Sequence, residues 1–129
     1  MKKTEMYWDI FAYGTLRQGF RNHHYVAGCP CLGRAETVEA YAMYVAGDIP
    51  YLVADEPHSR VVGEVYRVDA TRLRELDALE EHPREYCRAV APVVMADGAT
   101  AQAWIYFARR PFEGVLHTGD FAAWTPSRF

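Results

Sequence analysis

One predicted helix constrains the fold more than any other segment, because most of the remaining chain is typical of strands. The stretch 69–83 reads as an amphipathic helix, with Asp69 as its N-cap and Pro83 expected to end it. At about 100° per residue, an apolar arc is formed by Ala70, Leu73, Leu76 and Leu79. Glu80 falls inside this arc, whereas Glu75 falls outside it. The Glu80 carboxylate is therefore expected to face the core or a pocket, where it must be paired, neutralised or used.

Two simpler interpretations of Glu80 stay open at this point. The end of a helix often frays, so a carboxylate on the apolar side can swing into water. It can also have a purely structural role, with Arg88 as its ion-pair partner in the core.

The rest of the chain is dominated by strand patterns. Strand-like segments are found at 8–13, within 33–45 (including 37–38 and 41–45), and at 51–53, 61–68, 86–95 and 100–107. Asp97-Gly98 supplies a hairpin turn between the last two, and the 51–53 strand is expected at a sheet edge because Pro50 cannot donate to a ladder. The stretch 109–129 is aromatic and irregular, and is expected to lie over the body of the domain. The pattern predicts one α+β domain, residues 1–129, with a mixed or antiparallel sheet that can curl into a barrel.

Composition excludes several classes of protein. Half of the residues are apolar and 14% are aromatic, which argues against disorder. The net charge is −3 without a basic run, so neither nucleic acid nor an acidic membrane surface is expected as a partner. No apolar segment approaches the roughly 20 residues of a membrane span, and the basic N-terminus lacks the apolar stretch of a secretion signal. A cytoplasmic location is the expectation.

The cysteines do not predict a disulfide framework or a metal centre. Cys29, Cys31 and Cys87 make an odd count, and neighbours in a C-x-C pair rarely bridge each other. His23-His24 lies close to the first two, so a Cys/His cluster is conceivable, but no further ligands follow at zinc spacing. Reduced thiols and no bound metal are predicted.

A glycine-bracketed loop after the first strand is the second informative feature. It begins Tyr13-Gly14-Thr15-Leu16 and extends to Gly19. Glycine lets backbone N–H groups approach a ligand closely, and such groups can hold an anion or a developing oxyanion. The combination of this loop with the Glu80 carboxylate predicts a site.

These motifs together resemble the gamma-glutamylcyclotransferase-like family, in particular its small gamma-glutamylamine cyclotransferase branch. The resemblance rests on Phe11-Ala12-Tyr13-Gly14-Thr15-Leu16-Arg17, Asn22, Gly63-Glu64-Val65-Tyr66, Leu76-Asp77-Ala78-Leu79-Glu80, Pro83, Tyr86 and Arg88. It runs from about Asp9 to about Phe107, most of the chain.

The resemblance implies a small mixed β-barrel with one main helix, and a cavity between the loop and the helix. It implies that Glu80 is the catalytic acid/base, and that Tyr13, Gly14, Thr15, Leu16 and Tyr86 bind the substrate. The implied reaction converts a γ-glutamyl amine or γ-glutamyl amino acid into 5-oxoproline and a free amine, and needs no cofactor. The alternative is a non-catalytic module of the same fold that binds a small ligand or a protein. The sequence indicates neither one particular γ-glutamyl compound nor an oligomeric state.

Overall fold

The computed structural model describes residues 6–109 and 114–123. Its elements are β1 (Trp8–Ala12), the 3-10 helix η1 (His23–Tyr25), β2 (Cys31–Thr37), β3 (Ala42–Ala46), β4 (Ile49–Val53), β5 (Val62–Val68), α1 (Ala70–Leu79), β6 (Tyr86–Met95), β7 (Thr100–Ala108), β8 (Val115–His117) and the 3-10 helix η2 (Phe121–Ala123). None of the described helices is long or apolar enough to cross a membrane.

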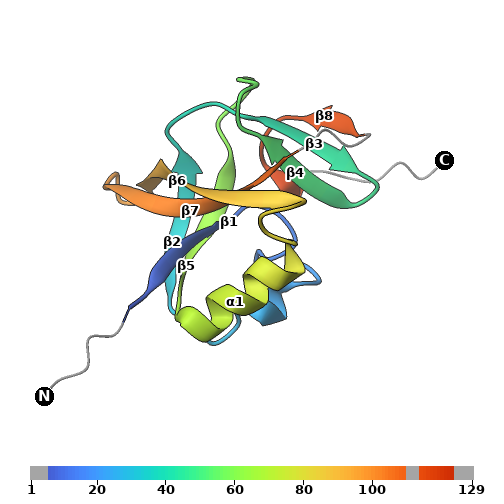
Figure 1. The fold of residues 1–129 in the computed structure, drawn as a ribbon. Helices are drawn as coiled ribbons and strands as arrows, with labels where there is room; N and C mark the ends of the chain where they lie inside the picture. The colour runs from blue at the N-terminus through green and yellow to red at the C-terminus, as the bar shows by residue number, and fades with distance from the viewer. Residues whose placement is uncertain (1–5, 110–113, 124–129) are drawn as a thin grey trace, which may run out of the picture.

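Five strands close into a barrel in the order β1-β5-β2-β6-β7. Strands β1 and β7 pair in parallel where Ile10 meets Trp104, and the other barrel pairs are antiparallel. Strands β4, β3 and β8 form a second, three-stranded sheet beside the barrel (Figure 1). Helix α1 lies against the outside of the barrel (Figure 1). The predicted mixed barrel with one main helix is confirmed, whereas the second sheet was not predicted as a separate layer.

Strand β1 is buried on both faces, which explains its nearly unbroken apolar sequence. Phe11 packs into the cluster that contains Val65 and Ile105. Its neighbour Ile10 packs in a second cluster with Leu76 of α1. Successive side chains of a strand point to opposite faces, so one face of β1 fills the barrel and the other holds the helix.

Helix α1 begins as predicted and ends earlier than predicted. The Asp69 side chain caps it by accepting a hydrogen bond of 2.9 Å from the Arg72 N–H. The last helical residue is Leu79, and Glu81 has a positive φ of 51°, so the expected helix up to Pro83 is wrong at its C-terminal end. A proline disfavours helical backbone in the residue before it, and here the chain leaves the helix well ahead of that point. The apolar arc is also narrower than expected, because Ala70 is exposed.

Three further strand predictions can be compared with the structure. The hairpin of β6 and β7 is confirmed, with Gly98 at a φ of 90° in its turn, and β4 lies at a sheet edge as expected. Strand β2 begins at Cys31, two residues before the stretch 33–45 in which strand-like segments were predicted. The irregular C-terminal stretch contains β8, which pairs with β3, and η2, which buries Phe121 in the core. Residues 110–113 and 124–129 of that stretch lie outside the described residues.

Candidate active site

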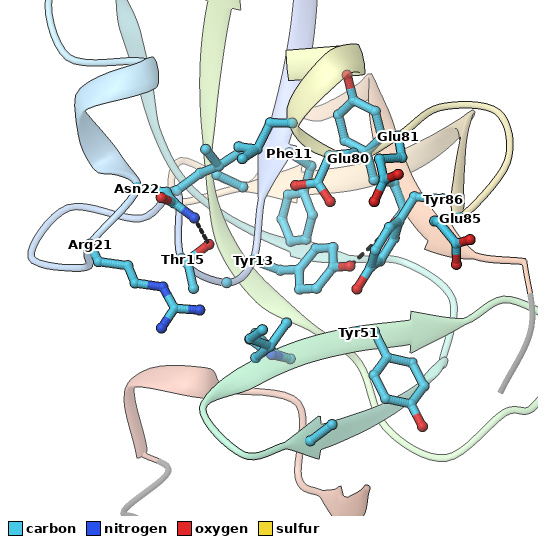
Figure 2. A pocket seen from close by; sticks show the side chains of 18 residues that line it. Phe11, Tyr13, Thr15, Arg21, Asn22, Tyr51, Glu80, Glu81, Glu85 and Tyr86 are labelled. Atoms are coloured by element: carbon cyan, nitrogen blue, oxygen red, sulfur yellow. Dashed lines mark hydrogen bonds between the residues drawn. The ribbon is translucent and has the colours of Figure 1, made fainter. Parts of the chain in front are cut away.

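A cavity of about 480 Å³ lies between the loop after β1, the C-terminal end of α1, the β3–β4 hairpin and the start of β6. All six residues predicted for the site line it: Tyr13, Gly14, Thr15, Leu16, Glu80 and Tyr86. Figure 2 shows Glu80 and Tyr86 on one side of the cavity, with Thr15 and Asn22 on the other. The chain thus brings the loop and the carboxylate together across about 65 residues of sequence, while the roles of the six residues stay predictions.

Glu80 is the C-cap residue of α1. Its N–H donates to the Leu76 carbonyl at 2.9 Å, which fixes the backbone, and its side chain is directed into the cavity (Figure 2). No hydrogen bond or ion pair joins its carboxylate to a described residue. Burial raises the pKa of Glu80 to about 7. The carboxylate therefore exists in both protonation states near neutral pH.

The alternative of an ion pair between Glu80 and Arg88 is wrong, because Arg88 binds a different carboxylate. Arg88 donates from Nε to Asp77 Oδ1 at 2.8 Å and from its terminal nitrogen to Asp77 Oδ2 at 3.1 Å. The Tyr106 hydroxyl donates to the same Oδ1 at 2.6 Å, and the Arg88 guanidinium lies 4.8 Å from the Trp104 ring centre. Burial alone would raise the pKa of Asp77, but the bonds from Arg88 and Tyr106 outweigh it and lower that pKa. This network ties the last turn of α1 to β6 and β7.

The loop after β1 is held by its own hydrogen bonds. The Arg17 N–H donates to the Gly14 carbonyl at 3.0 Å, and the Asn22 N–H donates to the Thr15 carbonyl at 3.0 Å. The Asn22 side chain also donates to Thr15 Oγ1 at 2.9 Å. The N–H groups of Gly14, Thr15 and Leu16 have no acceptor among residues 6–109 and 114–123. Because all three residues line the cavity, we expect these N–H groups to be available to a ligand there, as an oxyanion site requires.

Gly14 is required by protein packing rather than by an unusual backbone. It does not have the positive φ of a left-handed residue. A Cβ at this position would lie 2.6 Å from Pro50 Cγ of β4, closer than real Cβ contacts. Strand β4 therefore leaves no room for a side chain at this position, and a close ligand approach at Gly14 stays a prediction.

Tyrosines form much of the cavity wall. The Tyr13 hydroxyl donates to the Tyr106 carbonyl at 2.9 Å. Burial raises the pKa of Tyr13, and the neighbouring Tyr86 and Glu80 raise it further. Burial, followed by the Glu80 charge, also raises the pKa of Tyr86. Both phenols are therefore neutral at physiological pH.

Sequence reasoning missed several residues that line the cavity. The β3–β4 hairpin contributes Ile49, Pro50 and Tyr51, and the turn after α1 contributes Glu81 and Glu85. Pro50 was the sequence signal that could have indicated this hairpin, because proline within a sheet marks an edge strand, and an edge strand can face a site.

The three cysteines are free thiols. No group of three or more His, Cys, Asp or Glu side chains suited to a metal occurs among the described residues.

Comparison with known proteins places this architecture in a family. The family model for gamma-glutamyl cyclotransferase, AIG2-like, matches residues 10–124. The chain is 41% identical to "Putative gamma-glutamylcyclotransferase MJ1514" of Methanocaldococcus jannaschii over 113 residues, 87% of this chain and 93% of that protein. It is 34% identical over 114 residues to the gamma-glutamylcyclotransferase family protein YtfP of Escherichia coli K12, covering 87% of this chain and 94% of that protein.

A solved structure gives the same result for the fold. The crystal structure of an AIG2-like protein from Mus musculus superposes with a TM-score of 0.74 and 32% sequence identity. The superposition covers 80% of this chain and 78% of the mouse chain. With a family match that spans the barrel, α1 and the cavity loop, the chain belongs to the gamma-glutamyl cyclotransferase, AIG2-like family.

Proposed function

We propose that the protein cyclises γ-glutamyl amines or γ-glutamyl amino acids to 5-oxoproline, with release of the free amine. One observation carries the proposal: Glu80, a half-buried carboxylate without an ion-pair partner in the described structure, lines the same cavity as Gly14, Thr15 and Leu16, whose backbone N–H groups have no acceptor among the described residues. The names of the relatives support the same type of reaction.

The reaction needs one proton shuttle. Ionised Glu80 takes a proton from the α-ammonium group of the substrate, and the resulting amine attacks the γ-carbonyl carbon to form a five-membered ring. Protonated Glu80 then returns the proton to the leaving nitrogen as the bond between that nitrogen and the γ-carbon breaks. After the attack the ring nitrogen carries one proton more than the lactam does, and Glu80 moves this second proton to the released amine. The products are therefore 5-oxoproline and an ammonium ion, and no water is consumed. A pKa of about 7 suits a group that must act as base and then as acid.

The loop supplies the electrostatic part of the mechanism. The γ-carbonyl oxygen gains negative charge as the amine adds, and the N–H groups of Gly14, Thr15 and Leu16 are suited to stabilise it. The attack is intramolecular, and holding the substrate folded orients the amine toward the γ-carbonyl; effective molarities for well-oriented intramolecular attack reach about 10⁵ M or more. Orientation and charge stabilisation together are sufficient for this chemistry.

The test is 5-oxoproline release from a panel of γ-glutamyl amines and γ-glutamyl amino acids. The same compounds with an acetylated α-amino group are the substrate control, because they cannot attack their own γ-carbonyl. Glu80→Gln is expected to abolish release, and Glu75→Gln, on the exposed side of the same helix, is expected to leave it unchanged. Ligand binding without any release by the unmodified protein would favour the non-catalytic binding module instead.

A further inference from the structure

The segment 119–121, at the start of η2, contacts the cavity loop through Asp120 and Phe121. Arg17, in the loop, is 6% exposed although it is charged. Its terminal nitrogen donates to Asp120 Oδ1 at 2.8 Å, and its Nε lies 3.6 Å from Glu64 Oε2 of β5. Glu64 Oε1 also accepts a hydrogen bond of 2.9 Å from the Gln18 N–H. A buried arginine held between two carboxylates fixes the backbone that carries it.

Apolar contacts reinforce the same junction. The rings of Phe20 and Phe121 have centres 5.1 Å apart, and Phe121 is buried in the core. The Gly119 carbonyl accepts from the Val62 N–H at 2.9 Å, so the segment that carries Asp120 is itself attached to β5. The loop is therefore held between β5 and a segment that lies more than 100 residues later in the sequence.

The contacts of the loop show what this attachment controls. The Phe20 N–H donates to the Arg17 carbonyl, and the Arg17 N–H donates to the Gly14 carbonyl, each at 3.0 Å. A shift of Arg17 would consequently move Gly14 and the unbonded N–H groups beside it. Misplacement of oriented donors by about 1 Å can reduce catalysis by about 10²-fold.

We propose that Asp120 is a positioning residue for the cavity loop, which acts through Arg17 to direct the N–H groups of Gly14, Thr15 and Leu16 into the cavity. This inference rests on the proposed function for its effect on turnover, but not for its effect on the loop. Asp120 touches no reacting atom in this arrangement. Its carboxylate holds Arg17, and Arg17 holds the loop.

The test compares Asp120→Asn, Arg17→Met and the double variant in the 129-residue chain. Asparagine keeps an oxygen for the Ala122 N–H, which Asp120 now caps at 3.0 Å, but removes the charge that faces Arg17. Asp120→Asn is expected to lower kcat/KM for 5-oxoproline release by about tenfold or more. The double variant should be no worse than Arg17→Met, because the two side chains act as one unit.

Amide hydrogen exchange over residues 13–22 provides a readout that does not depend on turnover. Asp120→Asn should accelerate exchange there, whereas Asp9→Asn, which breaks the 2.9 Å ion pair with Arg67 at the far end of β1, should change neither exchange in this segment nor kcat/KM. If the unmodified protein releases no 5-oxoproline, accelerated exchange would still support the loop attachment while the proposed function fails. Any of three results would overturn the proposal. The first is unchanged exchange over residues 13–22, and the second is additive losses of kcat/KM in the double variant. The third is a lower melting temperature with unaltered loop exchange and kinetics. If Asp120→Asn does not fold, Arg17→Met alone is compared by the same two measurements.

Discussion

Among single residues, Glu80 is expected to lower the stability of the fold at neutral pH. Its pKa is about 7 in the folded protein and near 4.5 when unfolded, so the folded state binds more protons between these values. Stability from this group therefore falls as pH rises from about 4.5 to about 7, and the full penalty of about 3 kcal/mol applies above that range. Glu80→Gln should match the unmodified protein near pH 4.5 and exceed its free energy of unfolding at pH 8. Urea denaturation at both pH values measures this, and a strong loss of stability at pH 8 would mean that the carboxylate is structural.

The same titration sets the expected pH dependence of activity. As the base, Glu80 must be ionised in the free enzyme, so kcat/KM should rise with pH through about 7 and level off above it. The measurement is the initial rate of 5-oxoproline release at low substrate concentration from pH 5 to pH 8.5. A rise centred near 4.5 would show that Glu80 is not desolvated in the working enzyme.

At the scale of elements, the contact between the cavity loop and β4 depends on a missing side chain. Gly14→Ala places a Cβ 2.6 Å from Pro50 Cγ, so β4 or the loop must shift. Overpacking of this kind costs about 1–3 kcal/mol. We expect Gly14→Ala to lower the free energy of unfolding by that amount. Adding Pro50→Ala, which removes the clashing Cγ, should restore much of the loss, and equal stability of the single and double variants would show that the clash is relieved elsewhere.

The attachment of α1 to the β6–β7 hairpin gives a second prediction at this scale. Asp77→Asn removes the charge that accepts two bonds from Arg88, and should destabilise the protein by about 1–3 kcal/mol at pH 7. Because the folded pKa of Asp77 is lowered, its contribution is present above its unfolded pKa and is lost as pH falls through the folded value. The difference between the two proteins should therefore be constant from about pH 5 to pH 8 and shrink below about pH 4. A difference that persists at pH 2 would assign the effect to packing.

For the whole molecule, local patterns predicted the elements better than their assembly. The 86–107 hairpin and the start of α1 depend on turn and cap chemistry within a few residues, and both are confirmed. Strand β8 has only three residues, and its partner β3 lies about 70 positions earlier, so no local pattern marks it. The parallel contact of Ile10 with Trp104 closes the barrel and is equally non-local. The strand pattern was compatible with either an open sheet or a barrel, and the family resemblance implied the barrel.

In the candidate site, too, local patterns were predicted better than the contacts between distant segments. The helical spacing of Glu80 and the glycine loop were readable because each is encoded in one short segment. The partners of these segments could not be predicted: Arg88 was one alternative partner for Glu80, and it instead binds Asp77, one turn earlier in the helix. The choice between the two carboxylates depends on where α1 ends and how it lies on β6, which is set by packing rather than by sequence spacing. The contact of Arg17 with Asp120 could not be predicted either, because it also depends on how distant segments pack.

The molecule as a whole is expected to work without a metal ion. His23 and His24 each have Nδ1 at a backbone carbonyl, 3.0 Å from that of Leu16 and 3.1 Å from that of Arg21. Cys29 and Cys31 lie nearby in sequence, but they form no group of three or more potential metal ligands with the described residues. The proposed cyclisation requires only a proton shuttle and oriented N–H donors. Dialysis of untagged protein against a chelator should therefore change neither 5-oxoproline release nor the melting temperature, whereas one equivalent of zinc, with activity lost on its removal, would overturn the proposed mechanism.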